Sequence, residues 1–428
     1  MFLLKIDSIA VPAASCSELR SGKFYRFTKE IQQNTILNRA TIELLGAELP
    51  TAGTELIGRN WVSAVESIFR ISLFIVVSLF VPLLFIPGLN KLAADKFTLP
   101  GEFKKHFLHQ FEDLTHKKNT KEDNEKFKQK LVAVEGEAAV KQYLGPNEEK
   151  HESRVQEYKS KLAKAKSDVM QKDILYVGLL TYMVPWVQNW FTKNILGVVG
   201  FTGEETYLDE SQKDESVQLH EKTKWIKFPL GFVSTIFGSN WYSDKVYKAV
   251  TSKNEAIGKG KFMNFIKHNL KQFDYYKEIY ANKLNLAGSY LFGADFGVLL
   301  ACRSLNELCE RILRLAVFWP TLFLGVEWVN YKLGERSDRL NGTKLVDHAS
   351  PKELGIRQIR SLEELENALQ EAESKQDKEQ AEVISKSIKG QIKNYWTSIM
   401  LDSAVMSIGL TSANIVGTKI RVEKFGIY

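Results

Sequence analysis

The chain has 428 residues, of which 44% are hydrophobic and 25% charged, and its formal net charge is +7 at pH 7. A mean hydropathy of −0.21 is low for a compact transporter, while a long uncharged apolar run near the N-terminus is unusual in a soluble enzyme. The positive charge would suit nucleic acid, but lysine-rich loops beside membrane segments are the ordinary topogenic signal. We therefore expect a membrane protein and no nucleic-acid partner.

Residues 1–68 form a polar region in which several glycines interrupt the pattern. From Ile71 to Leu89 the chain then runs for about 19 residues without a charge, which is enough to cross a bilayer as a helix. In water such a helix would be hydrophobic on every face and would need a deep core around it. Trp61 before the run and Lys91 after it favour lipid, and two prolines predict a kink.

The following region, 93–173, is densely charged and predicts amphipathic helices that fold back as a hairpin. Apolar residues recur there at spacings of three and four, and the last series has the pattern of a short coiled-coil seam. The three series are Phe103, Phe107, Phe111 and Leu114; Phe127, Leu131, Val134 and Ala138; and Val155, Tyr158, Leu162, Ala165 and Val169.

Further apolar segments follow, separated by an acidic stretch at 203–224 and a basic stretch at 243–283. The segment from Ile174 to Thr192 is long enough to cross, whereas Phe228–Tyr242 is short and either crosses a thinned region or lies in the interface. Later segments are less uniform because they contain acids or prolines. Ser361 and Glu364 form a capping box that predicts a charged helix over 361–390.

The tryptophans gather in or beside the apolar segments, mostly near their ends, which is typical of an aromatic belt at the headgroup level. The alternative is that they are ordinary core residues. The eight are Trp61, Trp186, Trp190, Trp225, Trp241, Trp319, Trp328 and Trp396.

A stripe of small residues recurs every four positions and contains a GxxxG pattern. Its members are Ser289, Gly293, Gly297 and Ala301. In lipid, small residues allow two helix backbones to approach closely. The stripe fits either homo-oligomerisation or packing against another helix of the same chain, and we prefer the second interpretation because the motif does not name its partner.

Three acids lie inside apolar segments: Asp295, Glu327 and Asp402. A carboxylate there is costly to ionise and is usually protonated, paired, or exposed to a water-filled cavity. One hypothesis is an ion or proton path through the bundle. The other, which we favour, is that some of these segments are interfacial and the acids reach water.

Four residues at helical spacing provide the only candidate metal ligands: His106, His109, Asp113 and His116. Imidazole and carboxylate groups on one helix face can bind zinc, but this spacing matches no familiar metal motif. A solvated polar face explains the pattern better. We expect no cofactor, and no nucleophile-elbow, phosphate-loop or CxxC motif indicates catalysis.

The sequence thus predicts an all-α, multi-pass helical membrane protein with projecting charged amphipathic helices. In chain order we expect a small polar region at 1–68, a first span at 69–92, a charged helical hairpin region at 93–173, membrane segments with an acidic loop at 174–242, basic linker helices at 243–283, membrane segments at 284–331, a charged helical region at 332–393, and a C-terminal membrane segment with a tail at 394–428.

For function, the absence of a catalytic motif and the presence of amphipathic seams favour a non-enzymatic membrane scaffold or assembly subunit. Its expected partners are the lipid bilayer, other membrane or peripheral protein subunits, and a second copy of the chain. The alternative is a channel or transporter that uses the intramembrane acids. A third hypothesis is a membrane-remodelling or pore-forming protein whose short, tryptophan-flanked segments lie flat on the bilayer.

Overall fold

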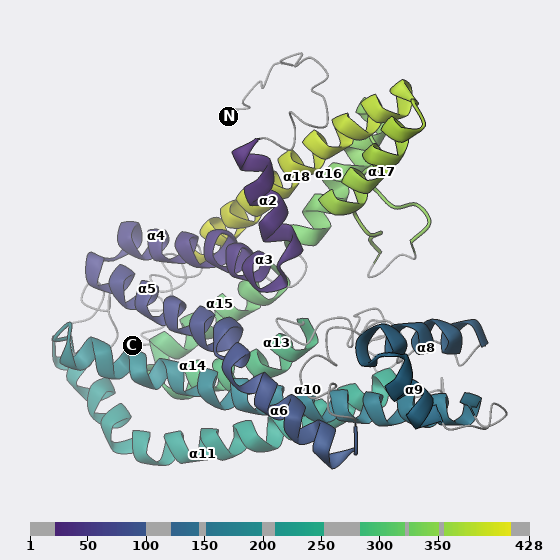
Figure 1. Ribbon diagram of the computed structural model, residues 1–428. Coiled ribbons are helices and arrows are strands. Elements are labelled where there is room, and N and C mark those ends of the chain that lie inside the picture. Colours follow the sequence, from purple (N-terminus) through teal and green to yellow (C-terminus); the bar gives the residue numbers. More distant parts are fainter. Residues whose placement is uncertain are drawn as a thin grey trace. The chain divides into compact units, whose positions relative to one another are not determined.

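The computed structural model describes residues 22–99, 121–144, 151–198, 210–251, 283–321, 325–350 and 355–411. These residues are mostly helical, and an isolated antiparallel bridge joins Val346 and Ile359 (Figure 1). The all-α prediction is therefore confirmed for the described part of the chain.

Two compact units divide the chain. Unit 1 comprises Met1–Pro50 and Phe318–Met406, and unit 2 comprises Thr51–Val317 and Ser407–Tyr428. The helices α4 (Leu49–Gly58), α15 (Leu305–Pro320) and α18 (Lys378–Thr411) pass from one unit into the other. Each unit is described below by itself.

Unit 1 is built around the pairing of its first helices with the long helices near the C-terminus. Its elements are α2 (Lys23–Gln33), α3 (Thr35–Thr41), the π-helix η1 (Ile42–Glu48), α16 (Val326–Asn341), α17 (Leu362–Ser374) and most of α18. One buried cluster joins α2, α17 and α18 and consists of Tyr25, Leu345, Leu362, Leu365, Leu369, Ala372, Ile384 and Ile388. Lys29 of α2 also forms an ion pair with Glu366 of α17.

The capping box at the start of α17 is present. The Ser361 hydroxyl accepts a hydrogen bond from the Glu364 backbone N–H (3.1 Å), and the Glu364 carboxylate accepts one from the Ser361 N–H (2.7 Å). The charged helix predicted for 361–390 is nevertheless interrupted. The backbone turns at Gln376, whose φ is 55°, and the Asp377 carboxylate accepts from the Gln380 N–H at 3.0 Å, so that a second helix, α18, begins.

Unit 2 contains the longest helices. Its elements are the rest of α4, α5 (Trp61–Ile75), the π-helix η2 (Val76–Phe80), α6 (Pro82–Lys96), α8 (Lys121–Glu135), α9 (Glu137–Leu144), α10 (His151–Asn194), α11 (Glu210–Thr251), α13 (Lys283–Ser289), the π-helix η5 (Tyr290–Asp295), α14 (Phe296–Leu300) and α15. The 44-residue α10 is the central helix, because α5, α6, α11, α13, η5 and α14 all pack along it (Figure 1).

The first apolar run lies in a continuous 36-residue helical stretch, Trp61–Lys96, made of α5, η2 and α6. Among the described residues, it is the one helix long and apolar enough to cross a membrane by length and composition. Only 28% of its apolar window is buried inside the structure, whereas the core helix of a soluble protein would be mostly buried.

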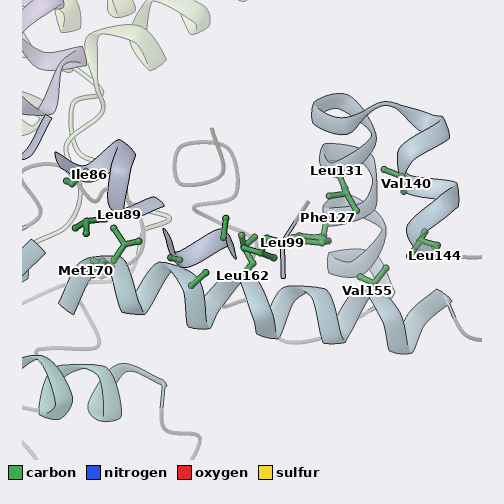
Figure 2. Packing of buried hydrophobic residues seen from close by; sticks show 14 residues of the cluster. Ile86, Leu89, Leu99, Phe127, Leu131, Val140, Leu144, Val155, Leu162 and Met170 are labelled. Atoms are coloured by element: carbon green, nitrogen blue, oxygen red, sulfur yellow. The ribbon is translucent and has the colours of Figure 1, made fainter. Parts of the chain in front are cut away.

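The N-terminal half of α10 packs against α8 and α9 through one buried apolar cluster. Figure 2 shows Phe127 and Leu131 of α8 and Leu144 of α9 gathered beside α10. Their cluster also includes Val155, Leu162, Ala165 and Val169 of α10, together with Leu89 and Leu99. The predicted second helix is split, since Gly136 adopts a φ of 83° and separates α8 from α9.

Candidate membrane surface and buried ion-pair network

The outward face of α11 carries its largest apolar side chains. At helical spacing, six of them leave between 47% and 78% of their surface exposed: Trp225, Ile226, Leu230, Val233, Phe237 and Trp241. Apart from Lys227, the stretch from Trp225 to Trp241 contains no charged residue. A continuous apolar stripe of this length is not expected on a face that water covers.

The inward face of α11 carries small and hydroxyl-bearing residues, together with Phe228 and Phe232, whose rings contact Tyr182 of α10. Thr235, Ser239 and Ser243 are buried, and the Thr235 hydroxyl donates to the carbonyl of Gly231 one turn earlier, at 2.9 Å. A Cβ added to Gly231 would lie 2.5 Å from the Tyr182 hydroxyl of α10. Toward α10 the helix thus presents small residues beside two aromatic rings, while six large apolar side chains point outward, where a soluble amphipathic helix would carry polar ones.

The small-residue stripe makes a similar contact with α10. A Cβ added to Gly293 would lie 2.2 Å from the Gly178 carbonyl oxygen, and one added to Gly297 would lie 2.6 Å from the Tyr182 carbonyl oxygen. Ser289 donates a hydrogen bond to the Ile174 carbonyl at 3.3 Å, and Ala301 accepts one from Asn189 at 2.8 Å. All four members therefore face α10 of the same chain.

A cluster of four charged residues is buried where α4 and α15 meet. Arg59 pairs with Glu55 (2.8 Å from Nη1 to Oε2) and with Glu310, and Arg314 pairs with Glu310 (2.6 Å from Nη2 to Oε1) and with Glu55. None of these four side chains is more than 8% exposed. The two acids and two bases alternate, so each charge has two opposite neighbours.

This alternation keeps Glu55 and Arg59 ionised. Burial by itself would raise the pKa of Glu55, but the charges of Arg314 and Arg59 outweigh it, with a hydrogen bond from Ser63, and hold that pKa well below its usual range. Burial by itself would lower the pKa of Arg59. The carboxylates of Glu310 and Glu55 outweigh this effect and raise that pKa. Glu55 and Arg59 therefore stay charged at neutral pH.

A second cluster joins α5, α10 and α15. Arg303 pairs with Glu66 (3.0 Å) and with Glu307 (3.2 Å), and Arg311 pairs with Glu307 at 3.2 Å. Glu66 also accepts hydrogen bonds from two side chains of α10, those of Gln188 (2.8 Å) and Thr192 (2.9 Å). The two clusters together hold four glutamates and four arginines, so their formal charges cancel.

The space beside the second cluster is small. A pocket of about 10 Å³, which is room for roughly one water molecule, is lined by Arg70, Pro185, Gln188, Asn189, Val298, Ala301, Glu307 and Arg311. A pocket of this size has no room for an organic substrate. The arrangement is suited to holding helices together, since every carboxylate of the network is already engaged by arginine.

Sequence reasoning missed this network. Its partners lie far apart in the chain, as with Arg303 and Glu66, which are separated by 237 positions. The available signal was local: Arg303, Glu307 and Arg311 recur at spacings of four in a short charged segment between apolar runs. A helix with such a charged face between two apolar segments requires opposite charges elsewhere in the chain.

The structure does not gather the other predicted site residues into one place. Asp295 is buried in η5 of unit 2, whereas Glu327 and Asp402 belong to unit 1. Glu327 is exposed on α16, and Asp402 is only 3% exposed and lies against Gly46 and Gly325. The candidate metal ligands His106, His109, Asp113 and His116 lie outside the described residues.

Within the described ranges, no group of three or more His, Cys, Asp or Glu residues is placed to hold a metal ion. In comparisons with known proteins, the chain matches no family model, no curated protein and no solved structure.

The close packing of η5 on α10 predicts that two glycine-to-alanine substitutions differ sharply in their effect on the free energy of unfolding. Gly293→Ala places a methyl group against a backbone oxygen and should lower the free energy of unfolding by about 1–3 kcal/mol. Gly88→Ala in α6 gains the same helix propensity but has no neighbour within 4 Å, so it should be neutral or stabilising. Denaturant titration of both purified variants in detergent measures the difference, and equal stabilities would contradict the packing.

The buried network predicts that removing one carboxylate charge is costly. Glu307→Gln deprives Arg303 and Arg311 of a shared partner and should destabilise the protein by about 3–5 kcal/mol. Glu371→Gln removes a charge whose partner, Lys375, is a solvent-exposed neighbour on the same helix, and should leave the unfolding midpoint unchanged. If both variants unfold like the parent protein, the network does not stabilise the fold.

Proposed function

We propose that the chain is a multi-pass integral membrane scaffold or assembly subunit, and that it holds partner proteins beside the bilayer without catalysing a reaction. One observation carries this proposal: the outward face of α11, on which six large apolar side chains are exposed. Burying a large apolar side chain is worth about 1.5–3 kcal/mol, so six of them on one face amount to about 10 kcal/mol of unfavourable exposure in water. Lipid removes that exposure.

Four helical stretches of unit 2 are the proposed crossings: Trp61–Lys96, the C-terminal half of α10, the middle of α11, and α13 to α14. The predicted crossing at Ile174–Thr192 is the second of these. Salt bridges at the two ends of the α10 crossing support the proposal, because they bracket the uncharged part of that helix. Lys193 pairs with Glu221 at 3.2 Å at one end, and Lys172 pairs with Asp168 at 2.7 Å at the other.

The scaffold role rests on the chemistry of the charged groups. In the buried network every glutamate is paired with arginine and the formal charges cancel, so we assign its charges to helix packing rather than to moving ions or protons. Outside the proposed bundle, α8, α9 and the N-terminal half of α10 form a hairpin with a buried apolar seam and exposed charges. Such a surface suits polar contact with other membrane or peripheral subunits.

Conduction through the intramembrane acids is the competing function. It requires that Asp295→Asn abolish ion flux in proteoliposomes while the protein remains folded. The scaffold proposal requires that purified protein show no such flux and that Asp295→Asn leave partner binding unchanged.

The membrane assignment predicts that glutamate substitution of two similarly exposed leucines has different effects on membrane fractionation. Leu230 on α11 is 60% exposed and Leu340 on α16 is 64% exposed. A charge at the lipid face costs about 3 kcal/mol, so Leu230→Glu should move much of the protein out of the alkaline-carbonate-resistant membrane fraction. Leu340→Glu should fractionate like the parent protein. Release of the parent protein itself by carbonate would overturn the membrane assignment.

The scaffold role predicts loss of partners when exposed charges on the hairpin are reversed. Lys141 of α9 and Lys164 of α10 are exposed, and changing both to glutamate should weaken co-purification of partner chains in mild detergent by about tenfold. Changing both Lys332 and Lys386, exposed lysines of α16 and α18 in unit 1, to glutamate serves as the charge-matched control. A parent protein that purifies alone would count against the scaffold role.

A further inference from the structure

The exposed apolar face of α11 has a defined length. It begins at Trp225 and ends at Trp241, and an exposed lysine lies on the same face beyond each end, Lys222 and Lys245. At 1.5 Å per residue, the two tryptophans are about 24 Å apart along the helix axis. Tryptophan at the headgroup boundary and lysine just beyond it are the usual markers of where a helix leaves the hydrocarbon.

The antiparallel α10 gives a second, independent measure. Its exposed apolar residues run from Tyr176 to Trp190, about 21 Å along the axis. Lys172 and Lys193 lie beyond the two ends. The two helices are in register, because the Tyr182 hydroxyl donates to the Phe228 carbonyl at 2.7 Å and Lys193 pairs with Glu221.

The longer α5–α6 stretch meets α10 at the same two levels. The ring of Phe69 stacks on that of Phe191 with centroids 3.9 Å apart, and Phe85 makes an edge contact with Tyr176 at 5.7 Å. Along α5–α6 these two phenylalanines are about 24 Å apart. Two helices, α10 and α11, therefore place their apolar limits at similar heights, and α5–α6 contacts α10 at those levels.

We propose that this bundle is matched to a hydrocarbon core of about 24 Å, and that its partner is a bilayer thinner than the typical core of about 30 Å. This inference rests on the membrane proposal above and adds the kind of membrane that fits. In a thicker bilayer the tryptophans and lysines of α10 and α11 would be drawn into hydrocarbon, or the lipid around them would have to thin. Either response costs free energy for each ångström of mismatch.

The test uses the full-length protein reconstituted into phosphatidylcholine vesicles of four chain lengths: myristoleoyl, palmitoleoyl, oleoyl and erucoyl. The thermal unfolding midpoint should be highest in one of the two shorter lipids and lower by about 5 °C or more in erucoyl vesicles. An equal midpoint in all four lipids, or a maximum in oleoyl or erucoyl vesicles, would overturn the thickness match.

A double lysine variant tests directly whether Lys222 and Lys245 mark the two ends of the apolar face of α11. Replacing Lys222 and Lys245 together with leucine lengthens the apolar face of α11 at both ends, so the chain length giving the highest midpoint should increase. Lys164→Leu, on the part of α10 outside the proposed bundle, should leave that optimum unchanged. If the lysine pair does not shift the optimum, the ends of α11 do not set the thickness.

The failure of this inference differs from the failure of the membrane proposal. Protein that carbonate removes from every vesicle type contradicts the membrane assignment itself. Protein that resists carbonate in all four lipids but has one common midpoint contradicts only the thickness match. Dimers cross-linked through α11, together with that common midpoint, would mean that a second copy of the chain covers the face, which also overturns the inference.

Discussion

The close approach of η5 to α10 is the constraint on which unit 2 depends. Gly293 and Gly178 bring the two backbones so near that even a methyl group would meet a carbonyl oxygen. With the small residues of each helix used on this inner face, the large apolar side chains are left for the outer one. Packing by small residues and exposure of large ones are therefore two results of the same arrangement, and both are features of the membrane bundle that we propose.

The buried arginines and glutamates hold helices together by ion pairing rather than by apolar packing. Buried charges are tolerated only when each has an opposite neighbour and its hydrogen bonds are made. The alternation of Glu55, Arg59, Glu310 and Arg314 satisfies that requirement, and Glu66 extends it to α10 through Gln188. Helices from distant parts of the sequence are thereby fixed in one register.

Much of the local structure could be predicted from the sequence because its causes are local. The capping box at Ser361 and the apolar spacing along α10 follow from neighbouring residues. The break at Gly136 was missed because glycine inside a helical pattern is ambiguous until its φ is known. The ion-pair network was missed for another reason: a single sequence does not show which distant glutamate neutralises a given arginine.

The uninterrupted helix α10 has a mechanical consequence. From His151 to the level of Pro185 it runs without a break, from the hairpin seam at Leu162 to the tightly packed Gly178. A rigid rod has no joint at which a bend can be absorbed. A force that tilts its hairpin end therefore acts as torque on the other end and reaches α11, η5 and α14, which pack against it.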